Sequence, residues 1–185
     1  MQAELVARAQ RGDREAFSTL ATGASARLYA TARLILTHPD RAEDAVQDAL
    51  VEAWRDIRGL RDPDRLDAWL HRLLVRACHR HLRRDYRRRV REISVPEIDA
   101  GETSDSARAF ADRDEMDHAF RRLTEDQRTI LALVYYADLP LADVAVALGI
   151  PIGTTKSRLN RAMAALRAAL AADERTPAIV NGQPA

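Results

Sequence analysis

The chain has 185 residues, of which 46% are hydrophobic and 31% are charged, so it can bury a core and is not of low complexity. The formal net charge is only +1, no apolar run approaches the ~20 residues of a membrane span, and the N-terminal stretch lacks the apolar core of a signal peptide. The single cysteine, Cys78, excludes an internal disulfide. Alanine, leucine and arginine dominate, which predicts an all-α protein. The lone cysteine suits a reducing cytosol, so we expect a cytoplasmic protein, and the lack of a long apolar run predicts no membrane insertion.

The N-terminal half begins with two predicted helices. Asp13 has the position of an N-cap for a helix over residues 14–36, and the sequence His-Pro-Asp then interrupts the pattern. Asp40 and Glu43 have the spacing of a capping box with an aspartate as the cap. The helix that follows, over residues 41–57, carries apolar residues at helical spacing.

The polar face of this second helix is rich in acids. Such a face is usually only solvated, but it can also present a surface to a basic protein. The residues on it are Glu43, Asp44, Gln47, Asp48, Glu52 and Asp56.

The third predicted helix carries a stripe of cations. A loop with Gly59 and Pro63 precedes it. Residues 66–84 then have an apolar side, on which Trp69 takes a core position, as Trp54 does on the helix before. An arginine stripe without interleaved acids is typical of a phosphate-binding helix, and a solvated basic surface is the alternative. The opposite side gathers Arg72, Arg76, His79, Arg80 and Arg83.

Charge is sorted in the middle of the chain. Residues 72–91 contain nine arginines and one acid, whereas residues 97–117 contain eight acids and two arginines. The acids either keep a connecting segment solvated or mask the basic surface when no nucleic acid is bound.

The acidic segment also has the composition of a linker, because Pro96, Gly101 and small polar residues replace any apolar repeat. We therefore predict two small helical domains joined by a flexible linker. The predicted parts are a first domain over residues 12–90, a linker over 91–112, a second domain over 113–172 and a tail over 173–185.

The second domain opens with a well-marked helix. Thr124 and Gln127 form a capping box for residues 125–139, whose apolar composition suits a buried helix. Pro140 then begins a short helix over residues 141–148.

A turn and a last helix complete a helix-turn-helix. Gly149 closes the short helix, and Pro151 lies beside the first position of the last helix, where its missing N–H is tolerated. The apolar side of the last helix, which must pack on the helices before it, consists of Ile152, Thr155, Leu159, Ala162, Met163, Leu166 and Leu170. A helix-turn-helix inserts the N-terminal end of this helix into the major groove, whereas the alternative is an ordinary surface helix. The predicted DNA-binding residues are Thr154, Lys156, Ser157, Arg158, Asn160 and Arg161.

Three strings carry a family resemblance, and they occur in the order AEDAVQDALVEAW, DAWLHRLLVRACHR and LTEDQRTILALVYYADLPLADVAVALGIPIGTTKSRLNRAMAAL. Together they strongly resemble the extracytoplasmic-function (ECF, group IV) sigma factors of the sigma-70 family, which are bacterial transcription initiation factors. The resemblance covers roughly Gly12 to Leu170. It implies a sigma region 2 helical bundle followed by a sigma region 4 helix-turn-helix.

The resemblance implies a role for each polar surface. The helix over residues 42–54 is similar to region 2.2, which docks on the coiled coil of the polymerase β′ subunit, and the implied polymerase-binding residues are Asp44, Gln47 and Asp48. The loop over residues 58–65 and the helix after it are similar to regions 2.3 and 2.4, which melt and read the −10 element. The implied −10 contacts are Arg72, Arg76, Arg80 and Arg83. The last helix is similar to region 4.2, which reads the −35 element.

The chain departs from the family pattern in the region 2.4 helix. Arg76 and Arg80 stand where the pattern usually has asparagine and an acid or amide. We expect the two arginines to strengthen phosphate contact at the expense of base reading.

The resemblance implies three partners: core RNA polymerase (β and β′ subunits), promoter DNA and an anti-sigma factor. We expect neither an enzyme nor a cofactor or metal site, because no glycine-rich phosphate loop, metal-spaced His/Cys/Asp set or nucleophile–base pair is legible. The alternative function is a stand-alone helix-turn-helix transcriptional regulator, which would dimerise on two half-sites.

Overall fold

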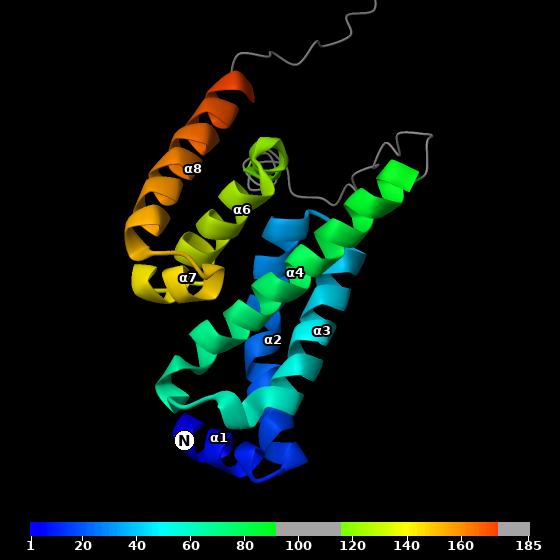
Figure 1. Ribbon diagram of the computed structural model, residues 1–185, viewed down its shortest axis with the longest axis vertical. Helices are drawn as coiled ribbons and strands as arrows, with labels where there is room; N and C mark the ends of the chain where they lie inside the picture. The colour runs from blue at the N-terminus through cyan, green and yellow to red at the C-terminus, as the bar shows by residue number, and fades with distance from the viewer. Residues whose placement is uncertain (92–115, 174–185) are drawn as a thin grey trace, which may run out of the picture.

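The structure of the protein, a computed structural model, describes residues 1–91 and 116–173, with side chains for residues 1–84 and 116–172. Every regular element in these ranges is helical, which confirms the all-α prediction (Figure 1). The predicted linker and tail lie almost wholly outside the described residues. The α-helices are α1 (Gln2–Gln10), α2 (Arg14–Leu36), α3 (Pro39–Asp56), α4 (Leu66–Arg91), α6 (Glu125–Leu131), α7 (Leu141–Leu148) and α8 (Ile152–Asp173).

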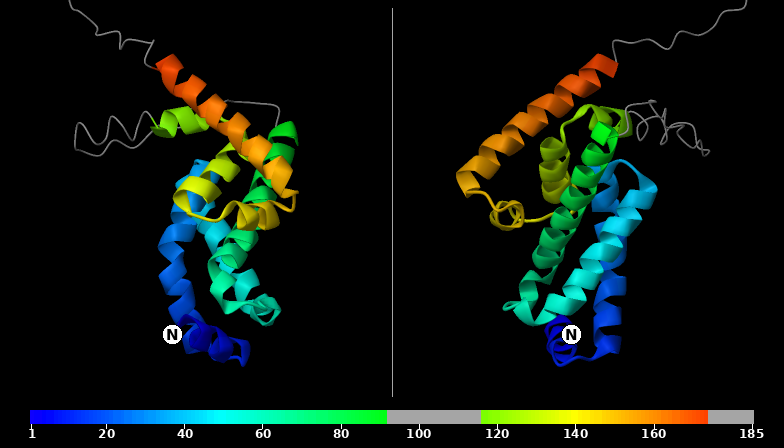
Figure 2. Two further views of the ribbon diagram at one scale, coloured as in Figure 1. Left: turned by 90° about the vertical axis from the view of Figure 1, so that its left-hand side faces the viewer. Right: turned by 45° about the vertical axis from the view of Figure 1, so that its right-hand side comes forward.

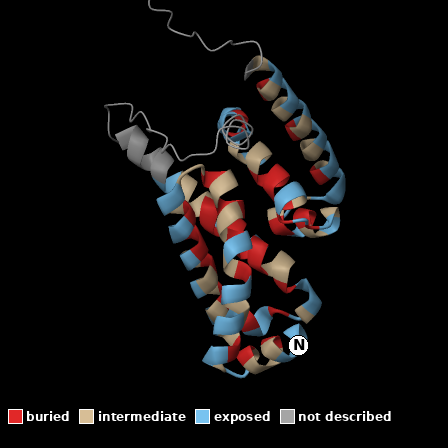
Figure 3. Ribbon diagram, turned by 180° about the vertical axis from the view of Figure 1, so that it is seen from behind, coloured by how far each residue is buried: buried red, intermediate tan, exposed pale blue. Residues whose placement is uncertain are grey.

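The N-terminal module is a bundle of α2, α3 and α4, with α1 lying across one end (Figure 1). The buried faces of the three long helices point toward one another (Figure 3). Large side chains that are almost fully buried, such as Leu28, Ile35, Leu73 and Leu74, form the centre of this core. The periodic apolar pattern thus places the polar faces of α3 and α4 on the outside of the bundle.

The start of α2 agrees with the sequence. Asp13 Oδ1 accepts hydrogen bonds from the backbone N–H groups of Glu15 and Ala16, at 3.0 and 3.1 Å, so Asp13 is the predicted N-cap. Arg8 pairs with the other carboxylate oxygen at 2.7 Å. The N–H of Ala16 and the Arg8 guanidinium together lower the pKa of Asp13, because both stabilise its charged form.

The start of α3 differs from the prediction. The helix begins at Pro39 with His38 as its N-cap, so the predicted capping box of Asp40 with Glu43 is wrong. Proline is favoured at the first position of a helix because its fixed φ suits the helix and its missing N–H needs no partner there. Asp40 instead lies in the first turn, where its charge is favourable to the helix dipole.

The second module begins with a helical segment at residues 116–122, and α6 after it starts with a cap predicted from the sequence. The Thr124 hydroxyl accepts from the Gln127 N–H at 3.4 Å, and the Gln127 side chain accepts from the Thr124 N–H at 2.9 Å. The helix does not continue regularly to residue 139, however. After α6 it widens into the π-helical turn η3 (Ala132–Tyr136), in which the Ala137 N–H bonds the Ala132 carbonyl at 2.9 Å.

The helix-turn-helix is formed by α7 and α8, with α8 on the outside of the molecule (Figure 2). Gly149 ends α7 with a φ of 67°, a left-handed conformation that glycine adopts without steric cost. Pro151 directly precedes α8. The turn chemistry therefore places the two helices as the sequence predicts.

The two modules contact each other directly. Helix α7 packs on α4, and α6 packs on α2 (Figure 1). Arg128 of α6 donates from Nε to the carbonyl of Ile35 at 2.9 Å and from a terminal nitrogen to the carbonyl of Leu123 at 2.7 Å. Burial at this interface lowers the pKa of Arg128. Arg128 thus satisfies a carbonyl in the last turn of α2 from the other module.

His71 of α4 is buried in the first module, with 2% of its surface exposed. Its Nδ1–H donates to the Asp67 carbonyl at 2.8 Å, and Nε2 lies 3.4 Å from the Thr31 hydroxyl. Burial lowers the pKa of His71 below 6.5, because the charged imidazolium would lose its hydration.

This shift predicts an acid-sensitive fold. Below pH ~6.5 the unfolded chain binds a proton at His71 that the folded chain does not, so stability falls as pH falls, by at most about 1.4 kcal/mol per pH unit for one proton. Urea unfolding between pH 5 and 7.5 measures the slope. His71→Leu should flatten it, and an identical slope in both proteins would assign the pH dependence to other groups.

Candidate nucleic-acid and polymerase interfaces

The predicted DNA-binding residues of α8 lie together on the outer side of the helix. Lys156, Ser157, Asn160 and Arg161 are exposed, and Thr154 and Arg158 are half-buried. On the inner side Thr155 and Ala162 are buried as predicted. Ile152 is not, because it is 49% exposed in the first turn of the helix, so its predicted packing role is wrong.

Two of these cations differ in how they are held. Arg158 pairs with Asp126 of α6 at 3.2 Å, so part of its charge is used to tie α8 to α6. Arg161 donates from Nε to the Ser157 carbonyl at 3.3 Å, which fixes the guanidinium on the helix surface. The first turn of α8 contains no acid to balance its cations. The N-terminal half of α8 is therefore an electropositive surface with its hydrogen-bond donors exposed.

The arginine stripe of α4 is divided into two kinds of residue. Arg72 and Arg83 are exposed and pair with none of the described acidic side chains. Arg76 and Arg80 instead both pair with Glu52 of α3, the second at 3.2 Å. Two of the four predicted −10 contacts are therefore partly neutralised by Glu52, an acid that the sequence placed on a face either solvated or open to a basic protein.

The second module approaches the same side of α4. His79, predicted on the cationic stripe, is half-buried, and its Nε2 lies 3.4 Å from Glu125 Oε1 of α6. Toward the start of α4, a pocket of about 240 Å³ lies between the 59–65 loop, α4 and α7, with Trp69 and Arg72 in its lining. Arg65 of the loop pairs with Asp143 of α7 across this pocket. Helix α7 thus contacts the end of the loop predicted to face the −10 element, while most residues of that loop remain exposed.

The predicted polymerase-binding residues lie on α3, and they do not all point the same way. Asp44 and Gln47 are exposed. Asp48 is half-buried and lies 3.2 Å from His81 Nε2, so it connects α3 to α4. Only the first two are unobstructed contacts for a partner.

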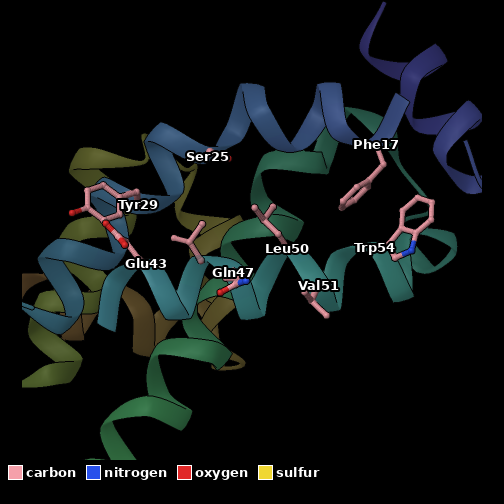
Figure 4. A pocket seen from close by; sticks show the side chains of 9 residues that line it. Phe17, Ser25, Tyr29, Glu43, Gln47, Leu50, Val51 and Trp54 are labelled. Carbon is pink, nitrogen blue, oxygen red and sulfur yellow. The ribbon is translucent and has the colours of Figure 1, made fainter. Parts of the chain in front are cut away.

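An apolar groove of about 520 Å³ runs beside Gln47 between α2 and α3 (Figure 4). The rings of Phe17 and Trp54 meet at one end, with centroids 5.0 Å apart and planes at 59°. Trp54 is half-buried and forms a wall of the groove rather than part of the core predicted for it, whereas Trp69 packs against the core as predicted. Val51 of α3 lines the groove and is 43% exposed, and such an apolar patch often marks a protein contact.

Comparison with protein families matches both modules. The sigma-70 region 2 family matches residues 21–89, and the sigma-70 region 4 family matches residues 119–168. The ECF RNA polymerase sigma factor SigM of Mycobacterium tuberculosis is 35% identical over 164 residues, which is 89% of this chain and 82% of that protein. The chain belongs to the ECF family of sigma factors.

This sigma factor is also similar to a second ECF sigma factor and to two proteins of known structure. The ECF sigma factor EcfG of Rhodopseudomonas palustris is 36% identical over 138 residues, covering 72% of this chain and 74% of that one. A structure of CnrH in complex with the cytosolic domain of CnrY matches with a TM-score of 0.66 and 27% identity, over 93% of this chain and 98% of that one. RpoE of Bartonella quintana, in complex with the anti-sigma factor NepR, matches with a TM-score of 0.68 and 29% identity, over 79% and 91%.

Three further features of the described residues concern Cys78, metal ligands and helix length. Cys78 is fully buried, and burial raises its pKa to about 12, so the thiol stays protonated at neutral pH. Among the described side chains, no three His, Cys, Asp or Glu residues are grouped to hold a metal ion. None of the helices described is both long and apolar enough to cross a membrane.

Proposed function

We propose that this protein is a group IV sigma factor that binds core RNA polymerase and directs it to promoters by reading a −10 and a −35 element. The observation that carries the proposal is the presence of both sigma regions in one chain, each with an exposed polar or cationic face. The proposed domains keep the sequence boundaries, residues 12–90 and 113–172. The protein acts in the cytoplasm and is not an enzyme, since polymerase supplies the chemistry.

Core polymerase docks on α3. Asp44 and Gln47 offer polar groups, and the groove beside Gln47 offers apolar surface (Figure 4). Asp48 contributes from the seam with α4, where His81 holds it. An apolar groove flanked by acids suits the helical coiled coil of β′, provided that the coiled coil presents basic residues at its edge.

Promoter DNA is read by α4 and α8. The stripe of α4 follows the displaced strand near the −10 element, where cations contact phosphates and a pocket can receive an unstacked base. The N-terminal half of α8 enters the major groove at the −35 element, where Arg158 and Arg161 are suited to pair with guanine. Because one chain reads both the −10 and the −35 element, it positions polymerase on the promoter without forming a dimer.

An anti-sigma factor is the third partner that we propose. RpoE of Bartonella quintana is seen with the anti-sigma factor NepR, and CnrH is seen with the cytosolic domain of CnrY. Both RpoE and CnrH resemble this chain over most of their length. The alternative of a stand-alone regulator is not favoured, because such a protein has no use for a sigma region 2 module.

Copurification with core polymerase tests the proposal. We expect the protein to retain β and β′, and we expect Asp44→Lys to weaken that association about tenfold or more, because the reversed charge faces the basic partner. Asp56→Lys, a matched reversal at the exposed far end of α3, is the control. Absence of polymerase from the wild-type complex, or of a sigma-dependent transcript with core enzyme and a cognate promoter, would contradict the proposal.

A further inference from the structure

One acid on α3 binds two arginines of α4. Glu52 Oε1 accepts from Arg76, and Glu52 Oε2 accepts from Nη1 of Arg80 at 3.2 Å. The Glu52 side chain is 25% exposed, while the two arginine side chains remain about half exposed, at 50% and 41%. Each carboxylate oxygen is therefore assigned to one guanidinium, and both guanidinium groups still reach the surface.

This arrangement changes what the two arginines can do. The three side chains together carry a charge of +1 rather than +2, so their attraction for phosphate in general is reduced. A guanidinium has five N–H donors, and the ion pair with Glu52 uses few of them. The remaining donors are held in a fixed direction, so less conformational entropy is lost when they meet a base edge.

Glu52 is not part of a diffuse acidic surface. It lies on the side of α3 that meets α4, next to the pair of Asp48 with His81 one turn earlier on the helix. The outer members of the stripe, Arg72 and Arg83, have no ion pair within the described residues, and they are the ones suited to contact phosphate without a fixed orientation.

We propose that Glu52 is a positioning residue for promoter recognition: it orients Arg76 and Arg80 toward base edges and reduces their general affinity for phosphate. The inference rests on the proposed function, in which the α4 stripe meets the −10 element. It reverses the expectation from composition alone, under which two additional arginines favour phosphate contact over base reading.

The test uses holoenzyme and a promoter recovered by run-off transcription of the host genome. Binding is measured to that promoter and to a copy with a scrambled −10 element, over a series of salt concentrations. E52Q should lower the ratio of the two affinities on the order of tenfold, the discrimination of one bidentate contact. Its salt dependence should steepen by roughly one phosphate equivalent, because a released arginine is added to the electrostatic contacts.

E52D separates position from charge. It keeps the carboxylate but is one methylene shorter, so it cannot reach both arginines as Glu52 does. We expect a wild-type salt dependence with reduced discrimination. Two results would show that Glu52 acts only through its charge and would overturn the proposal. One is wild-type discrimination between the two promoters by E52D, and the other is an equal gain in affinity of E52Q for both promoters.

A double variant keeps the two proposals distinguishable. In the R76Q/R80Q background, E52Q should have no further effect. If R76Q/R80Q leaves −10 discrimination unchanged, the assignment of the stripe to the −10 element fails. If R76Q/R80Q lowers discrimination and E52Q does not, only the positioning role fails. D56N, which makes the same charge change on an exposed acid of α3, is the control, and thermal melting checks that all variants fold.

Discussion

Replacing Arg161 by alanine is expected to weaken recognition of the −35 element by about 5- to 150-fold, while leaving polymerase binding unchanged. The range corresponds to the ~1–3 kcal/mol that a bidentate arginine–guanine pair contributes to discrimination. Arg161 is exposed on α8, and its bond to the Ser157 carbonyl uses Nε rather than the terminal nitrogens. Competition between promoters with intact and scrambled −35 elements measures the effect.

Arg167→Ala is the matched control, because Arg167 is also exposed on α8 but lies toward the end that does not enter the groove. We expect it to change binding little. An equal loss for Arg161→Ala on intact and scrambled −35 elements would mean that Arg161 touches phosphate only. Arg158→Ala should have a smaller effect on discrimination, because Asp126 already occupies one of its terminal nitrogens.

Local chemistry explains what the sequence predicted correctly. The caps at Asp13 and Thr124 and the left-handed turn at Gly149 depend on residues within three positions of one another, so their signals are complete in a short stretch. The apolar repeats of α3 and α4 likewise follow from helical geometry. The same local signals were enough to place the outer face of α8.

The wrong predictions fall where two local signals compete, or where the local sequence does not show what packs against a residue. Pro39 starts α3 one residue before the predicted cap at Asp40. Residues 130–133 are all buried, so their uniformly apolar sequence could not show where α6 widens into a π-helical turn. Ile152 fits the apolar repeat, but it is 49% exposed, whereas Thr155 three residues later is fully buried.

Contacts between segments far apart in the chain could not be predicted from the sequence. In the apolar repeat of α3, Glu52 falls on the polar face like the neighbouring acids. The two arginines that it binds, Arg76 and Arg80, lie 24 and 28 residues away in the sequence. Arg65 and Asp143 are 78 residues apart and belong to different modules. Periodicity assigns a residue to a face of its helix, but it does not identify the helix that covers that face.

The contact between Arg65 and Asp143 predicts that one charge reversal will separate the modules. Asp143 is 14% exposed and belongs to the pocket that also contains Arg72, so Asp143→Arg would replace the partner of Arg65 by a third cation beside Arg65 and Arg72. We expect a loss of ~1–3 kcal/mol at the interface between α4 and α7, after allowing for the half-exposed Arg65 side chain. The free protein should then show a larger radius of gyration in small-angle X-ray scattering.

The charge-swapped double variant, Arg65→Asp with Asp143→Arg, should restore the compact form, because it rebuilds the pair with opposite polarity. Circular dichroism establishes that α7 stays helical in each variant. If Asp143→Arg scatters like the wild-type protein, the packing of α6 on α2, including the Arg128 bonds, holds the modules together without the ion pair.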